Sequence, residues 1–260
     1  MPVDFNRLIE EAEKRPFSGW DFSYIDGRYV EGKPSWDFAG EARRMVQRSR
    51  SMLDIGTGGG EFLSSLSPLP GTCCATEGYA PNSYVARDRL LPIGVDVVFT
   101  FCDDNGLVPQ RGALPFKGGI FDFVMDRHES FVANEVERVL RRGGVFATQQ
   151  VGDGNNPELH EFFGKTRASE KGKRPWNLAE AVDEIESAGM KIVQKREERM
   201  SSRFLDVGAL VYYLKAIPWE IPDFDVRTYR ERLLEMHKQI LRTGSFGVTT
   251  TRFYVQARKE

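Results

Sequence analysis

The chain has 260 residues, of which 40% are hydrophobic, a size that suits one large α/β domain or a core domain with a cap. Its 36 basic and 38 acidic residues give a formal net charge of -2, which argues against a general polyphosphate binder but permits a local basic patch. The sequence opens without a signal-peptide pattern, and no apolar run approaches the ~18 residues that span a bilayer, so we expect a soluble cytoplasmic protein without membrane contact. Cys73, Cys74 and Cys102 lack metal-ligand or disulfide spacing, so we expect reduced thiols and no metal site.

The first 50 residues predict a helical and aromatic cap. Apolar residues at helical spacing follow Asp4, and a second helix is expected with Ser35 as its N-cap. Between these helices lies an irregular aromatic stretch that contains Trp20, Phe22, Tyr24, Tyr29 and Trp36. We therefore divide the chain into this cap, residues 1–50, and a core domain, residues 51–260.

From Ser51 onward, short apolar runs alternate with amphipathic stretches, a texture typical of a parallel sheet covered by helices. A sixth strand is predicted from Met190, and a last strand between residues 249 and 257, after a helical insertion at 199–246. The earlier strands are predicted near 51–55, 73–77, 95–101, 120–125 and 144–150. The predicted fold class is α/β, with a mostly parallel seven-stranded sheet and helices on both faces.

A glycine loop follows the first predicted strand. Met52–Ile55 runs directly into Gly56-Thr57-Gly58-Gly59-Gly60, and a helix is expected next. This order brings backbone N–H groups and the positive end of a helix to the carboxyl edge of the sheet, where a ligand can touch the main chain.

Two phosphate-binding fingerprints fail at this loop. Counted from Gly56 and Gly58, the third glycine of a dinucleotide motif would fall on Glu61, and no Gly-Lys-Ser/Thr follows as in a P-loop. An acidic residue within the loop suits a ligand with an ammonium group better than one with phosphates.

Asp54-x-Gly56-x-Gly58-x-Gly60 resembles the first motif of class I S-adenosylmethionine-dependent methyltransferases, which have a Rossmann-like fold. Two later segments resemble the type-11-like branch of that family: Leu114-Pro115-Phe116 with Phe121-Asp122-Phe123-Val124, and Glu137 to Gly144, where Arg142 replaces the usual proline. The resemblance covers residues 50–150 well and the cap and insertion poorly.

The resemblance implies S-adenosylmethionine as cofactor and S-adenosylhomocysteine as product. An acid at the end of the second strand would bind the ribose hydroxyls, and one of the two acids after the third strand would contact adenine. The implied cofactor-binding residues are Asp54, Gly56, Thr57, Gly58, Gly60, Glu77, Asp103 or Asp104, and Arg127.

The segment Asp126-Arg127-His128-Glu129, after the fourth strand, is the candidate for the reaction itself. His128 could act as a general base for a hydroxyl, phenol or amine, since its reference pKa is about 6.5. The alternative is that His128 and Glu129 cap the next segment or pair with Arg127. Candidate acceptor contacts are Gln149 and Gln150, at the end of the fifth strand, and the cap aromatics Trp20 and Tyr24, which could instead pack a small core.

The leading hypothesis is a methyltransferase that acts on an oxygen or nitrogen atom of a small molecule. An RNA methyltransferase would use a basic face, for which Arg141 and Arg142 with the 165–174 stretch are the candidates. A third hypothesis is a protein that binds S-adenosylmethionine without transferring methyl groups, because fold does not decide function. The oligomeric state is left open.

Overall fold

One sheet of eight strands organises this computed structural model, which describes residues 4–100, 113–165 and 176–260. The strand order is β1-β7-β8-β6-β5-β2-β3-β4, parallel from β6 to β4, with β8 antiparallel to both β6 and β7. The strands are β1 (Tyr29–Val30), β2 (Ser51–Ile55), β3 (Thr72–Glu77), β4 (Val95–Phe99), β5 (Phe121–Arg127), β6 (Leu140–Val151), β7 (Met190–Phe204) and β8 (Phe246–Lys259). The prediction of a mostly parallel α/β sheet is confirmed, and the predicted number of seven strands is wrong.

The additional strand, β1, comes from the N-terminal segment. Tyr29 and Val30 pair antiparallel with Phe204 and Arg203, at the far end of the 15-residue strand β7. Because β7 and β8 extend together beyond the other strands, the outer edge of β7 is free to pair with this segment. A two-residue strand has no periodicity, so the sequence carried no signal for it.

Nine helices of more than three residues are described in the same three ranges, and polar side chains cap several of them. Asp4 and Asn177 accept hydrogen bonds from backbone amides at the starts of α1 and α7. At α2 the cap is Asp37 and the predicted Ser35 is wrong, because Ser35 instead binds the Glu198 carboxylate on β7. The helices are α1 (Phe5–Lys14), α2 (Phe38–Arg48), α3 (Glu61–Ser65), α4 (Ala80–Leu90), α5 (Ala133–Val139), α6 (Pro157–Phe162), α7 (Leu178–Ser187), α8 (Val207–Ala216) and α9 (Arg230–Thr243).

Helices cover both faces of the sheet. α2, α3 and α4 pack on one face, where Met52, Phe123 and Tyr254 are buried, and α5 and α7 pack on the other face around Leu53 and Val124. The chain passes from β2 outward to β3 and β4, then returns to β5 on the other side of β2. The carboxyl ends of β2 and β5 therefore form the switch point of the sheet, which is where open α/β sheets bind ligands.

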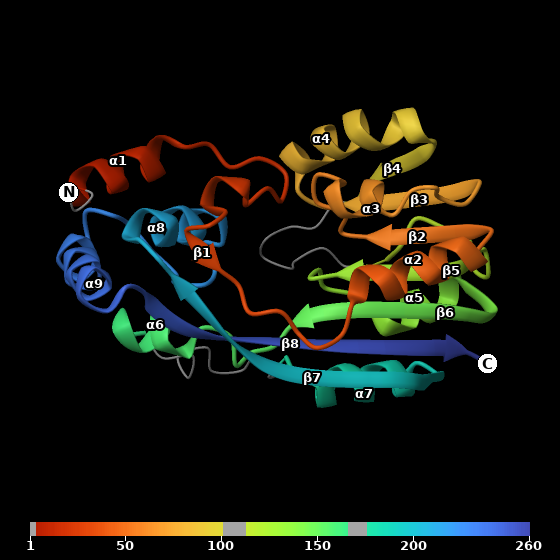
Figure 1. The fold of residues 1–260 in the computed structure, drawn as a ribbon. Helices are drawn as coiled ribbons and strands as arrows, with labels where there is room; N and C mark the ends of the chain where they lie inside the picture. The colour runs from red at the N-terminus through yellow and green to blue at the C-terminus, as the bar shows by residue number, and fades with distance from the viewer. Residues whose placement is uncertain (1–3, 101–112, 166–175) are drawn as a thin grey trace.

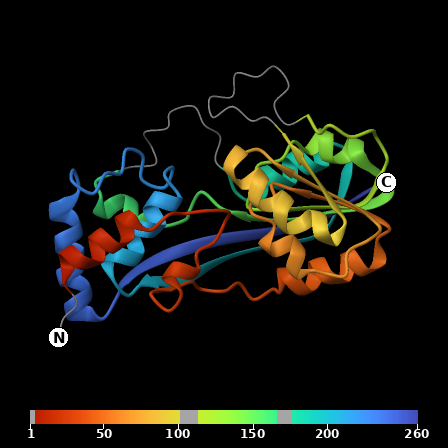
Figure 2. The same cartoon turned by 90° about the horizontal axis from the view of Figure 1, so that it is seen from above.

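A second lobe, here called the cap lobe, sits at the far end of β7 and β8 (Figures 1 and 2). It comprises α1, α6, α8 and α9 with the 3-10 turn Ser23–Ile25, and these elements share one apolar core. Nine of the ten residues of α8 are buried in it. The N-terminal helix and the insertion thus pack together, and the first residues of segment 199–246 are strand up to Phe204. Over the described ranges, no helix is long and apolar enough to cross a membrane.

Candidate functional site

The glycine loop lies at the switch point, and its backbone conformation requires glycine at three positions. Gly56, Gly58 and Gly60 have φ angles of +65°, +62° and +79°, in the left-handed region that side chains disfavour. A Cβ atom at position 60 would lie 2.7 Å from the Leu90 side chain, and one at position 56 would collide with the Glu129 side chain. The loop is therefore held closely between α4 and the segment that follows β5.

Glu77 joins the end of β3 to this loop. Its carboxylate accepts a hydrogen bond from the Tyr79 amide at 2.8 Å, and the backbone amides of Gly58 and Gly78 also favour its charged form. The side chain is buried, and burial raises its pKa above the ordinary value, while these backbone amides oppose the rise. The structure thus brings together the strand-end acid and the glycine loop, two features that lie about 20 residues apart in the sequence.

Asp54 lies buried beneath the loop, on β2. Burial raises the pKa of its carboxyl to about 7, and the neighbouring Thr57 side chain and the positive charge of Arg127 oppose the rise. The Thr57 amide donates to the Thr76 carbonyl at 2.9 Å, which ties the loop to the neighbouring strand. The loop consequently has an acid below it and another at its side.

These residues fit S-adenosylmethionine. The carboxylate of Glu77 has acceptor capacity for a ribose diol, and the two acids favour a ligand that carries positive charge. A Cβ atom added at Gly58 would lie 3.3 Å from the Cβ atom of Trp20. Trp20, a residue of the cap, therefore borders the surface of the loop at Gly58. Asp103 and Asp104, the predicted adenine contacts, lie outside the described residues.

His128 follows β5 and takes part in a chain of hydrogen bonds. It adopts a φ of +67°, and its amide donates to the Gln149 carbonyl at 2.8 Å. Its Nε2 lies 3.2 Å from Nε2 of Gln149, whose Oε1 accepts from the Trp36 indole N–H at 2.8 Å. Burial, together with the charges of Arg252 and Arg127, lowers the pKa of His128 well below its usual value.

Two arginines lie near this histidine. The Arg127 guanidinium stacks 4.5 Å from the centroid of the Phe62 ring on α3, and no ion pair to it is found among the described residues. Arg252, on β8, is buried; it pairs with Glu31 and donates to Asn155 Oδ1 at 3.0 Å. The surrounding protein lowers the pKa of Arg127, which remains accessible to solvent.

Gln150 faces the opposite side of the sheet from Gln149, since alternate residues of a strand point to opposite faces. Its amide donates to Asp126 Oδ1 at 2.7 Å and to the Glu129 carbonyl at 2.8 Å. Asp126 is fully buried and its pKa is raised well above the ordinary value, chiefly by burial. The two glutamines that the sequence presents as one cluster therefore belong to two different polar networks.

The two predicted aromatic contacts also separate. Trp20 borders the loop at Gly58, and its ring lies parallel to that of Trp219, with centroids 6.2 Å apart. Tyr24 packs on Tyr212 inside the cap lobe, with ring centroids 4.8 Å apart. Only the first of them is brought to the glycine loop.

Sequence reasoning missed Trp36 as a partner of Gln149, Glu129 as a neighbour of Gly56, and the Arg252–Glu31 pair. These contacts join segments more than 70 residues apart, and no local pattern announces them. The sequence did place Trp36 in the aromatic stretch of the cap, without its hydrogen bond.

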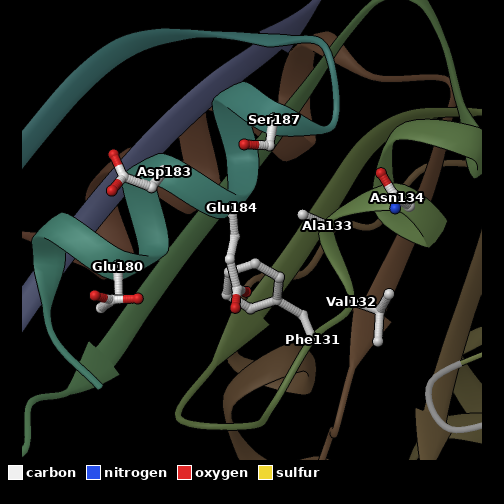
Figure 3. A pocket seen from close by; sticks show the side chains of 8 residues that line it. All are labelled: Phe131, Val132, Ala133, Asn134, Glu180, Asp183, Glu184 and Ser187. Atoms are coloured by element: carbon white, nitrogen blue, oxygen red, sulfur yellow. The ribbon is translucent and has the colours of Figure 1, made fainter. Parts of the chain in front are cut away.

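A surface groove between α5 and α7 lies away from this site (Figure 3). Phe131, Val132 and Ala133 line one side, and Glu180, Asp183 and Glu184 of α7 line the other. None of the predicted site residues lines it. The groove therefore adds no residue to the candidate site.

No protein-family model matches the sequence, and no curated protein matches it either. Solved structures do match. A Bacillus halodurans C-125 protein with a provisional methyltransferase designation aligns at a TM-score of 0.57 and 16% identity, over 85% of this chain and 98% of its own. The YcgJ protein of Bacillus subtilis aligns at a TM-score of 0.54 and 18% identity, over 85% of this chain and 97% of its own. A geranyl diphosphate methyltransferase, solved with geranyl diphosphate and sinefungin, aligns at a TM-score of 0.53 and 13% identity, over 98% of this chain and 99% of its own. The chain has the fold of these three proteins.

Proposed function

We propose that this protein is an S-adenosylmethionine-dependent methyltransferase that methylates an oxygen or nitrogen atom of a small molecule. The observation that carries the proposal is the contact between the Glu77 carboxylate and the backbone of the glycine loop at Gly58, above the buried Asp54. The loop stands at the switch point of the sheet, where this fold binds its ligands. The geranyl diphosphate methyltransferase was solved with sinefungin, an analogue of S-adenosylmethionine, and this supports the same cofactor for the present chain.

Each residue of the site has a role in this proposal. Glu77 accepts hydrogen bonds from the ribose hydroxyls, and the loop backbone contacts the methionine part of the cofactor. S-adenosylmethionine supplies an electrophilic methyl group, so the protein has to orient an acceptor atom and exclude water. Arg127 and His128, next to the loop at the end of β5, face the acceptor, and Trp20 closes the loop from the cap side.

Calorimetric titration with S-adenosylmethionine and with NADH tests the cofactor assignment. We expect micromolar binding of S-adenosylmethionine and none of NADH, because the third dinucleotide glycine is absent. Gly58→Ala should weaken binding by about tenfold or more, because the new Cβ enters the surface that the ligand contacts. Glu77→Gln should weaken it about tenfold by removing the charged acceptor for the ribose hydroxyls.

Gly94→Ala is the matched control for the glycine variant. Gly94 has a φ of +81°, so alanine strains the backbone there in the same way, but the added Cβ atom would have no neighbour within 4 Å. The affinity of the Gly94→Ala variant for S-adenosylmethionine should match that of the unaltered protein. Binding of NADH in place of S-adenosylmethionine would overturn the proposal, and binding without turnover over a broad set of acceptors would favour a non-methylating role.

A further inference from the structure

We propose that His128 is a hydrogen-bond donor for an anionic oxygen of the methyl acceptor, held in that role by Trp36 and Gln149, and that the acceptor is a carboxylate or phenolate. This inference rests on the proposed methyltransferase function and narrows its acceptor from oxygen or nitrogen to oxygen. It also replaces the general-base role predicted for His128 from the sequence.

The hydrogen-bond chain fixes the proton on the imidazole. An indole N–H can only donate, so the Gln149 oxygen must face Trp36, at 2.8 Å. The Gln149 amide nitrogen, also a donor, then faces His128 Nε2 at 3.2 Å, and Nε2 has to accept. The ring proton is therefore on Nδ1, and the nitrogen that could take a proton from an acceptor is already occupied.

The strand register places the arginines around this donor. Arg127 on β5 pairs with Gln149 on β6, and Val151 on β6 pairs with Arg252 on β8. Residues 149 and 151 share a face of the sheet, so both arginines project from the face that carries Gln149. The positive charges of both arginines also reach His128, since each lowers the pKa of its imidazole.

One of the two guanidinium groups has no salt bridge. Arg252 is paired with Glu31, whereas no ion pair to Arg127 occurs within the described part of the chain, and only the more distant charges of Glu31 and Asp54 act on it. A neutral donor beside such a guanidinium is suited to an oxygen anion and repels an ammonium group. An acceptor that arrives as an anion needs no base.

Methyl transfer to such an acceptor is balanced without His128 taking a proton. One O–C bond forms and the C–S bond of S-adenosylmethionine breaks, with its electron pair left on sulfur. The oxygen anion becomes a neutral ester or ether, the sulfonium becomes a thioether, and no proton remains to be removed. The residues around the acceptor only need to hold the anion in line.

Nitrogen-15 NMR of the histidine-labelled full chain tests the assignment of the proton. The sequence has three histidines, and His128→Asn identifies the resonances of this one. We expect His128 to stay neutral and protonated on Nδ1 between about pH 5.5 and about pH 8. A cationic ring or an Nε2–H form in this range would overturn the proposal.

Two variants perturb the hydrogen-bond chain itself. Gln149→Glu places a carboxylate at Nε2, so the proton should move to Nε2 and the pKa of His128 should rise. Trp36→Phe frees the Gln149 amide to rotate, so both the Nδ1–H and the Nε2–H tautomers of His128 should appear. Gln256→Glu, the same exchange at a half-buried position of β8, should leave the His128 resonances unchanged. An unchanged tautomer in Gln149→Glu would contradict the positioning role of Gln149.

Acetate and its neutral analogue acetamide probe the anion site. We expect acetate at millimolar concentration to shift the His128 resonances, acetamide not to, and Arg127→Gln to weaken acetate binding about tenfold. His128→Asn should keep acetate affinity within about threefold, because its amide N–H replaces Nδ1–H and asparagine tolerates a positive φ, whereas His128→Ala should lose about tenfold. Equal responses to both probes, or none to acetate, would overturn the anionic acceptor.

The outcome is separable from that of the proposed function. Calorimetry with S-adenosylmethionine on the same samples reports the cofactor site, whereas the histidine resonances and acetate binding are measured without cofactor. Cofactor binding with a failed acetate test would leave the methyltransferase proposal standing and remove only this inference.

Discussion

Asp54→Asn should change how the stability of the protein depends on pH. The Asp54 carboxyl has a pKa of about 7 in the folded chain because it is buried, against about 3.9 in an unfolded chain. Between these values the folded state binds a proton that the unfolded state releases, so stability falls as pH rises through about 4 to about 7. The full difference of about 3 pKa units corresponds to about 4 kcal/mol, of which about 3 kcal/mol falls between about pH 5 and about pH 8.

Urea denaturation followed by tryptophan fluorescence at several pH values measures this effect. The asparagine side chain of the variant cannot ionise, so the variant should gain about 3 kcal/mol relative to the unaltered protein between about pH 5 and about pH 8. Comparing the two proteins at each pH cancels other titrating groups, such as Asp126. Asp88→Asn, at an exposed position of α4, controls for the loss of one carboxylate from the chain. Parallel stability profiles for the Asp54 variant and the unaltered protein would show that the Asp54 carboxyl does not have a raised pKa in the folded chain.

Further predictions concern the cap. Trp20 lies against Gly58, so Trp20→Phe should remove most of the fluorescence change on binding S-adenosylmethionine; an unaltered signal would place Trp20 elsewhere in the complex. Asp206 caps α8 and accepts two hydrogen bonds from Nε and Nη2 of Arg28, at 2.8 and 2.6 Å, so Asp206→Ala should cost about 2–3 kcal/mol of unfolding free energy in urea. Asp37→Ala, which removes an exposed cap at α2, should cost only about 1 kcal/mol, and equal losses would mean that the Arg28 pair adds nothing.

The core of the fold follows from local patterns. The apolar runs at 51–55 and 73–77 became β2 and β3 within a residue, because strands covered on both faces must be apolar throughout. The helical character of segment 199–246 was predictable, and Asp206 caps α8 within it, because capping and helical periodicity depend on neighbouring residues. The length of β7 was not readable: its exposed residues alternate with few apolar ones, and it is stabilised by pairing with β8.

The candidate site divides in the same way. Gly56, Gly58 and Gly60 are recognisable because a left-handed backbone at alternate positions demands glycine there, and Glu77 because a strand-end acid follows at a fixed distance. The partner of His128 depends on which residue of β6 lies beside β5, and this is set by sheet register. Trp36 reaches Gln149 from 113 residues away, a contact that only the folded chain defines.

A crystal structure of the protein with S-adenosylhomocysteine tests the cofactor site directly. We expect density at the carboxyl ends of β2 and β5, with the ribose hydroxyls bound to the Glu77 carboxylate and the amino-acid part of the ligand over Gly58. Density at another place, or an empty glycine loop at saturating ligand, would contradict it.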